Sequence, residues 1–121
     1  MFQFIFDIPA AVRHAHAALK EGGVLLATFA GISQIAVDDM NIWGEYWRIT
    51  DAGARRLFGG VFGDAQVQVE VFGNCLLACA FLNGMVIDDL APADLDYRDP
   101  EFQLIIAVRA VKPSGATPAV R

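Results

Sequence analysis

The chain has 121 residues, a length that suits one domain with a buried core, and 55% of them are hydrophobic while 19% are charged. The net charge is −5 and the basic residues form no run, which argues against a nucleic-acid partner. The mean hydropathy of +0.43 is high, but the two longest apolar windows, 22–37 and 73–87, are too short to span a membrane, so we expect apolar surface for a partner instead.

The first predicted element is a helix over residues 7–22. Asp7 can cap its start, Pro9 fits its first turn, and Gly22 is a typical stop. Its apolar positions recur at spacings of three and four, as one face of a helix requires; they are Ile8, Val12, Ala15 and Leu19. We therefore expect one side of this helix to pack on the core.

A strand is predicted directly after this helix, from Val24 to Phe29. Its run VLLATF is continuously apolar, which is typical of a strand buried on both faces. The next segment, from Ala30 to Thr50, has no clean period and is predicted to be a long, partly ordered connection. Long connections in compact domains often carry function.

A second helix is predicted from Thr50, a capping residue, to Phe62, with Gly63 at its end. Its apolar stripe consists of Ala54, Leu57, Phe58 and Val61. The sequence QVQVEVFG then alternates between valines and polar side chains, which predicts a half-exposed strand.

The last third of the chain is predicted to contain a short buried helix capped by Asn74, then an acidic loop with at most one helical turn. A final strand follows from Phe102 to Val111, and its run of branched residues indicates a central place in the sheet. Residues 113–121 are predicted to be a flexible tail after a single domain of residues 1–112.

Few residues suggest chemistry by themselves. Cys75 and Cys79 are interpreted as reduced core thiols that cannot bridge easily at their spacing. Together with a start that lacks a signal peptide, they lead us to expect a cytoplasmic protein. His14 and His16 point to different sides of their helix, and the acidic loop lacks the pattern of a calcium loop, so no metal site is expected.

Four motifs, in this order, resemble the C-terminal half of class I S-adenosylmethionine-dependent methyltransferases. FQFIFD is similar to the segment after the family's fourth strand. LKEGGVLLATFAG is similar to its LKPGG turn into the fifth strand, with Glu21 in place of proline. WGEYWRITDAGARRLFGGVFG resembles the stretch before the next helix in a bacterial subgroup, and FQLIIAVRAVKP resembles the final, central strand. The resemblance covers roughly residues 2–113.

The resemblance implies an α/β fold: the C-terminal portion of a Rossmann-like methyltransferase sheet, with three main strands, the last one antiparallel, and helices packed on it. The family's cofactor is S-adenosylmethionine, and its N-terminal half carries the glycine-rich loop and ribose-binding acid. The densest glycine cluster here, Phe58 to Gly63, instead follows a helix. We therefore expect a methyltransferase-like protein that is weak or inactive alone and binds the cofactor weakly.

The candidate substrate-side residues lie in the connection after the first strand, which commonly faces the methyl acceptor in the family. They are Trp43, Tyr46, Trp47 and Arg48. One helical turn would bring the three aromatic residues together, either to pack on an acceptor or, alternatively, to fill the core. Gln3 and Phe4 are candidate remnants of the cofactor site.

An alternative to the enzyme hypothesis is a non-enzymatic α/β interaction module that associates with itself through apolar surface. Under either hypothesis we expect a partner: a second copy of the chain, or a missing N-terminal half. In the resembling fold the strand Val24–Phe29 pairs on both edges, whereas this chain offers a partner for one edge only. An unpaired apolar edge favours a homodimer.

Overall fold

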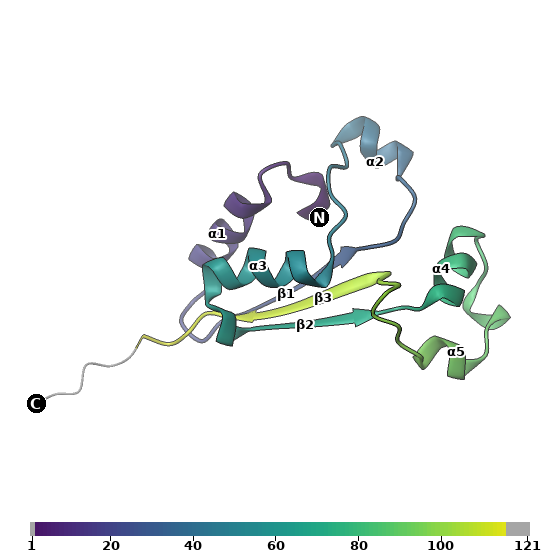
Figure 1. Ribbon diagram of the computed structural model, residues 1–121. Helices are drawn as coiled ribbons and strands as arrows, with labels where there is room; N and C mark the ends of the chain where they lie inside the picture. Colours follow the sequence, from purple (N-terminus) through teal and green to yellow (C-terminus); the bar gives the residue numbers. More distant parts are fainter. Residues whose placement is uncertain (1, 116–121) are drawn as a thin grey trace, which may run out of the picture.

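The computed structural model describes residues 2–115 and shows an α/β fold built on a three-stranded sheet (Figure 1). The strand order is β1-β3-β2, with β1 at Val24–Ala30, β2 at Val67–Phe72 and β3 at Ile105–Val111. β3 is antiparallel to both neighbours, so β1 and β2 run in the same direction. This confirms the prediction that the last strand is central and antiparallel.

Two helices cover one face of this sheet (Figure 1): α1, Ile8–Ala18, and α3, Asp51–Phe62. Their starts are capped as predicted, because Asp7 accepts a hydrogen bond from the backbone N–H of Ala10 and Thr50 accepts one from Gly53. Helix α1 ends earlier than predicted, since Leu19 already has extended backbone (φ −75°, ψ 142°). Gly22, at φ 74°, then forms the turn into β1.

The core lies between this helical layer and the sheet. Its largest fully buried side chains are Phe58 of α3, Ile106 of β3 and Val12 of α1. Phe2 packs at its edge from the short 3-10 helix η1, Phe2–Phe4, with its ring 5.5 Å from that of Phe29. The predicted alternation of β2 is confirmed, because its valines face the core and Gln68 and Glu70 are exposed.

The opposite face of the sheet is uncovered by any described helix, and we call it the open face. Leu26, on the edge strand β1, is 74% exposed, and Val24 and Ile105 are also exposed. The prediction that Val24–Phe29 is buried on both faces is therefore wrong. The run is apolar on both sides, but no described helix covers the side that carries Val24 and Leu26.

A protruding segment, residues 74–103, connects β2 to β3, and we call it the arm (Figure 1). It contains α4, Cys75–Leu82, a 3-10 helix η3, Ile87–Asp89, and α5, Pro92–Asp96. Asn74 caps α4 as predicted. The prediction that this helix is buried is wrong, because it lies beyond the end of the sheet and packs mainly on α5. Cys75 and Cys79 are free but exposed, so they are not core thiols.

The remaining elements are short connections. Residues 31–50 contain one brief helix, α2, Val37–Ile42, and the 3-10 helix η2, Asp64–Gln66, leads into β2. Lys112 continues the pairing of β3 with the turn at Gly22 and Gly23. Of the predicted tail, residues 116–121 lie outside the described residues. No helix within the described part of the chain has both the length and the apolar character needed to cross a membrane.

Candidate functional site

A hollow of about 380 Å³ lies at the carboxyl end of β1, and we call it the β1-end hollow. Four chain segments form it: η1, the end of β1 with the turn that follows, α4 of the arm, and the start of β3. Its lining residues are Gln3, Thr28, Phe29, Ala30, Ile32, Ser33, Phe81, Leu104 and Ile105. Segments that are distant in the sequence thus converge at one end of the sheet, where α/β proteins commonly bind ligands.

The backbone beneath this hollow is fixed by a glycine. The N–H groups of Gly31 and Ile32 donate to the carbonyls of Leu104 and Gln103, each at 2.9 Å, and so continue the pairing past the end of β1. A Cβ atom on Gly31 would collide with the Gln103 carbonyl. Only glycine permits this close approach of the two backbones, which sets the path of the lining residues that follow it.

The segment before α1 is held by the aromatic residues of the connection. Trp47 donates from Nε1 to the carbonyl of Phe6 at 3.1 Å, and the Tyr46 N–H donates to the carbonyl of Gln3 at 2.9 Å. The Phe6 ring centroid lies 5.4 Å from that of Tyr46 and 5.7 Å from that of Trp47. These contacts position Gln3, which lines the hollow; Phe4 is not among the lining residues.

Two expectations about these aromatic residues are wrong, while their contact with an acceptor stays a prediction. Trp47 is 39% exposed and Tyr46 is exposed as well, so the interpretation that they fill the core is wrong. The expectation that one helical turn gathers all three is also wrong, because α2 ends at Ile42 and Gly44 has a positive φ of 76°. Trp43 is 66% exposed, at the end of α2. None of the three lines the β1-end hollow.

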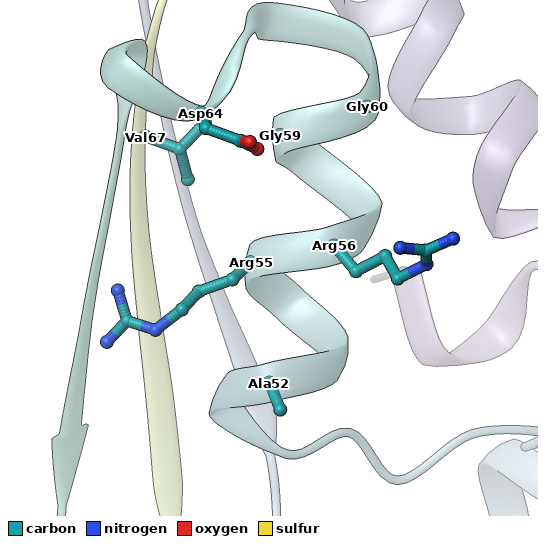
Figure 2. A pocket seen from close by; sticks show the side chains of 7 residues that line it. All are labelled: Ala52, Arg55, Arg56, Gly59, Gly60, Asp64 and Val67. Atoms are coloured by element: carbon teal, nitrogen blue, oxygen red, sulfur yellow. The ribbon is translucent and has the colours of Figure 1, made fainter.

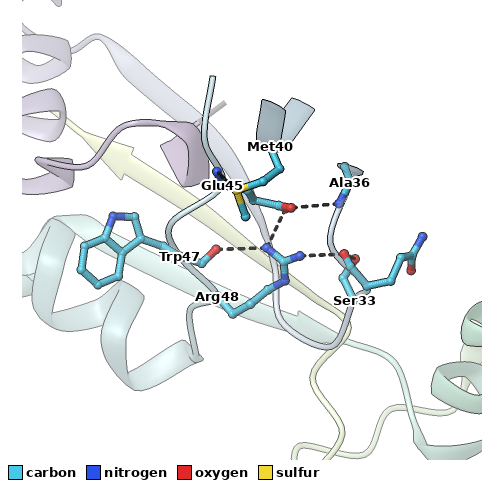
Figure 3. Close-up of polar contacts among 7 residues, drawn as sticks. Ser33, Ala36, Met40, Glu45, Trp47 and Arg48 are labelled. Atoms are coloured by element: carbon cyan, nitrogen blue, oxygen red, sulfur yellow. Dashed lines mark hydrogen bonds and ion pairs between the residues drawn. The ribbon is translucent and has the colours of Figure 1, made fainter. Parts of the chain in front are cut away.

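Arg48 holds the connection together (Figure 3). Its guanidinium donates from Nη1 to Glu45 Oε1 at 2.6 Å, from Nη1 to the Trp47 carbonyl at 3.3 Å, and from Nη2 to the Gln34 carbonyl at 2.7 Å. The other oxygen of Glu45 accepts from the backbone N–H of Ala36 at 3.0 Å. Arg48 is thus engaged in loop structure instead of pointing a charge at an acceptor.

The same contacts change the acidity of Glu45, whose side chain is only 6% exposed. The hydrogen bond from Arg48, and secondarily the one from the Ala36 N–H, holds the pKa of the Glu45 carboxyl below its ordinary value of 4.5. The folded chain therefore favours the ionised carboxylate more than the unfolded chain does. This stabilises the fold above the ordinary pKa and is lost as the pH falls through the lowered one.

Glu45→Gln is therefore expected to loosen residues 31–50 at neutral pH and to abolish their sensitivity to acid. Hydrogen exchange of the Ala36 amide, followed from pH 6 to pH 3 and corrected for intrinsic rates, measures both effects. The natural chain should lose protection below about pH 4.5, whereas the variant should start low and stay flat. Glu101→Gln, at an exposed carboxylate outside this cluster, serves as the control. Equal pH profiles for the Glu45 variant and the natural chain would contradict the assignment.

A larger depression, of about 750 Å³, follows the outer side of α3 and is less suited to binding (Figure 2). Its two arginines, Arg55 and Arg56, point to different sides of the helix. Arg55 donates to the carbonyl of Val69 at 3.1 Å, and the carboxylate of Asp64 lies against Gly59. The glycine cluster Phe58–Gly63 forms the last turn of α3 and its end, as predicted, so it offers no loop for a phosphate.

The arm residue Phe81 and the strand residues Thr28 and Ile105 were not predicted to share a site. Phe81 carries no signal of its own, since it lines the β1-end hollow only because α4 follows β2 at the end of the sheet where β1 also ends. No group of three potential metal ligands lies together among residues 2–115. No protein-family model matches the chain, and neither a curated protein nor a solved structure is significantly similar to it.

Proposed function

We propose that this chain is the acceptor-side part of a class I S-adenosylmethionine-dependent methyltransferase. The observation that carries the proposal is the sheet: β1 and β2 run in the same direction with antiparallel β3 between them. The helices on the same face, α1 before β1 and α3 between β1 and β2, agree with the order of elements that the resemblance implies. Free thiols at Cys75 and Cys79 suit a cytoplasmic setting.

In this proposal the β1-end hollow receives the methyl acceptor. Methyl transfer requires chiefly that the acceptor atom and the methyl group be held in line, so the protein's task is positioning. The chain would contribute the walls from β1, η1 and the arm. Acceptor orientation would come from a lining polar group, the Thr28 hydroxyl.

The described residues do not fit S-adenosylmethionine by themselves. The glycine cluster belongs to the end of α3, and no carboxylate lines the β1-end hollow to hold ribose hydroxyls. The cofactor side would therefore be supplied by further residues of the same polypeptide or by another chain. The free edge of β1 is the natural place for that part to pair.

The 121-residue chain is accordingly expected to bind S-adenosylmethionine far more weakly than micromolar, because the binding free energy of about 8 kcal/mol that a 1 μM dissociation constant represents cannot come from this fragment of a site. Isothermal calorimetry measures it. A second test is to read the coding sequence before Met1. We expect it to encode a strand followed by a GxGxG turn. The longer product should bind the cofactor at least a hundredfold more tightly.

Two outcomes would contradict the proposal. The first is micromolar, one-site binding of S-adenosylmethionine by this chain alone. That result would mean that the chain holds the cofactor without the glycine-rich loop and the ribose-binding acid. The second is an upstream frame that encodes a strand–turn–helix unit without the glycine turn and a longer product that gains no cofactor affinity. The second outcome would favour the next candidate function.

That second candidate is a non-enzymatic module that pairs with itself, and the open face of the sheet favours it. Val24, Leu26 and Ile105 are exposed there, and the first two belong to β1, an edge strand without a second partner strand among the described residues. Two such faces packed together would bury several hundred Å² of apolar surface at about 25 cal/mol per Å², before the costs of association. A closed two-fold dimer meets this requirement.

Sedimentation equilibrium at micromolar concentration is expected to give a dimer for the natural chain, and Leu26→Lys should shift the mass to that of a monomer of 13.1 kDa. The lysine places a charge on the β1 side of the open face, where burial in a dimer would be costly. Ile42→Lys, at a similarly exposed apolar residue on α2, is the control and should leave the mass unchanged. A natural chain that sediments as a monomer would contradict the self-association hypothesis.

A further inference from the structure

The β1-end hollow has the size and walls of a small-molecule site. Its volume of about 380 Å³ falls within the range usual for ligand pockets. Most of its lining is apolar: Phe29, Ile32, Phe81, Leu104 and Ile105. Three polar side chains interrupt this lining, Gln3, Thr28 and Ser33, and the Ser33 hydroxyl donates to the Gln34 carbonyl at 3.1 Å.

No described residue that lines the hollow has an ionisable side chain. Arg48, the basic residue of the adjoining connection, is engaged by Glu45 and by two backbone carbonyls. The arm that supplies one wall carries six carboxylates and one arginine, and the arginine, Arg98, pairs with Glu70 at 3.0 Å. An anion in the hollow would therefore lose hydration without gaining a counter-ion, and a cation would find no lining carboxylate.

We infer that the β1-end hollow binds an uncharged, largely apolar small molecule with one or two groups that form hydrogen bonds. The inference deepens the proposed function and rests on it only in one respect: under that function, this molecule is the methyl acceptor. The binding itself requires neither the cofactor nor methyl transfer. Phe81 has a specific part, because it closes the hollow from the side of the arm.

Three probes that share one benzene ring and one attached carbon test the charge preference: benzyl alcohol, benzoate and benzylamine. Each is titrated into the isotope-labelled chain, and amide chemical shifts are followed by NMR. Benzyl alcohol is expected to saturate in the low millimolar range, as befits so small a ligand. Its shifts should concentrate at residues 28–33 and 104–105. Benzoate and benzylamine should each bind at least tenfold more weakly.

Two matched variants on α4 test the site. Phe81→Ala removes a lining wall and should weaken benzyl alcohol at least threefold, whereas Leu82→Ala removes an exposed neighbour outside the lining and should not change it. Ala30→Phe fills the hollow and should abolish binding, with Ala17→Phe on the exposed side of α1 as its control. Unchanged amide spectra outside the site establish that each variant is folded.

The inference is overturned if a charged probe binds as tightly as benzyl alcohol, if no probe gives saturable shifts, or if the shifts centre on Val24 and Leu26, at the opposite end of β1. Its failure is distinguishable from that of the proposed function. If benzyl alcohol binds selectively but the longer product does not bind S-adenosylmethionine, the hollow remains a ligand site and the methyltransferase proposal is contradicted. If the longer product binds S-adenosylmethionine but the three probes bind equally well, the methyltransferase proposal stands and the inference about an uncharged ligand is contradicted.

Discussion

Replacing Phe58 by alanine is expected to lower the free energy of unfolding by about 3–5 kcal/mol, a large share of the 5–15 kcal/mol that small domains possess. Phe58 is fully buried, and its ring centroid lies 5.8 Å from that of Phe29, 6.0 Å from that of Phe2 and 6.4 Å from that of Phe62. Alanine would leave a cavity where the helical layer meets the sheet.

Urea unfolding followed by circular dichroism measures this loss as a lower midpoint with an unchanged slope. Phe6→Ala is the matched control, because Phe6 is 69% exposed and contacts only the aromatic residues of the connection among the rings described. It should cost less than about 1 kcal/mol. A Phe58 variant whose stability falls by no more than the control's would mean that the core is centred elsewhere.

The second large effect is expected at Asn74, the one buried polar side chain among the described residues. Its Oδ1 accepts from the Leu77 N–H at 2.9 Å, and its Nδ2 donates to the carbonyls of Asp94 and Tyr97, each at 2.8 Å. One side chain thus caps α4 and ties α5 to it. Alanine would remove the cap, worth about 1 kcal/mol, and leave two carbonyls unpaired, so we expect a loss of about 2–4 kcal/mol.

The loss at Asn74 should be confined to the arm, and hydrogen exchange resolved by residue measures that confinement. Amides of α4 and α5 should lose protection in Asn74→Ala, while those of β3 keep theirs. Asn74→Asp keeps the capping oxygen but cannot donate, so it should protect the first turn of α4 without restoring α5. Asn83→Ala, at an exposed asparagine of the same arm, is the control. Uniform loss across the whole chain would show that the arm and sheet unfold as one unit.

The elements with strong local signals could be predicted from the sequence. Asp7 and Thr50 mark helix starts because their side-chain oxygens can bond to N–H groups three residues later, a contact that needs no tertiary partner. The alternation of valines and polar residues in β2 could be predicted because one face of the strand packs on the core and the other is exposed. The strand order agrees with the resemblance, and the central place of β3 follows from its apolar run.

Burial was the part that local pattern could not determine. The sequence CLLACAFL is as apolar as a core helix, yet whether such a helix is covered depends on what other segments reach it, and here the arm extends past the sheet. The same holds for Leu26 on the open face. In the β1-end hollow, Gln3 was a candidate by resemblance, whereas Phe81 joins it because β1 and β2 end at the same side of the sheet, an arrangement that no short sequence spacing indicates.

The hydrogen bond from Arg55 to the Val69 carbonyl affects how copies of the chain can assemble. Val69 belongs to β2, which forms one border of the sheet, and the guanidinium occupies a backbone acceptor that a neighbouring strand would otherwise use. Among the hydrogen bonds described, no side chain donates to a backbone carbonyl at the β1 border. Addition of a strand at the β2 border would have to displace the hydrogen bond from Arg55, whereas at the β1 border the engaged carbonyl is that of Ala30, at the end of the strand, which accepts from the Ile49 N–H at 3.4 Å. An assembly that used the β1 border would be complete at two copies, which would protect a chain with this much exposed apolar surface from polymerising into fibres.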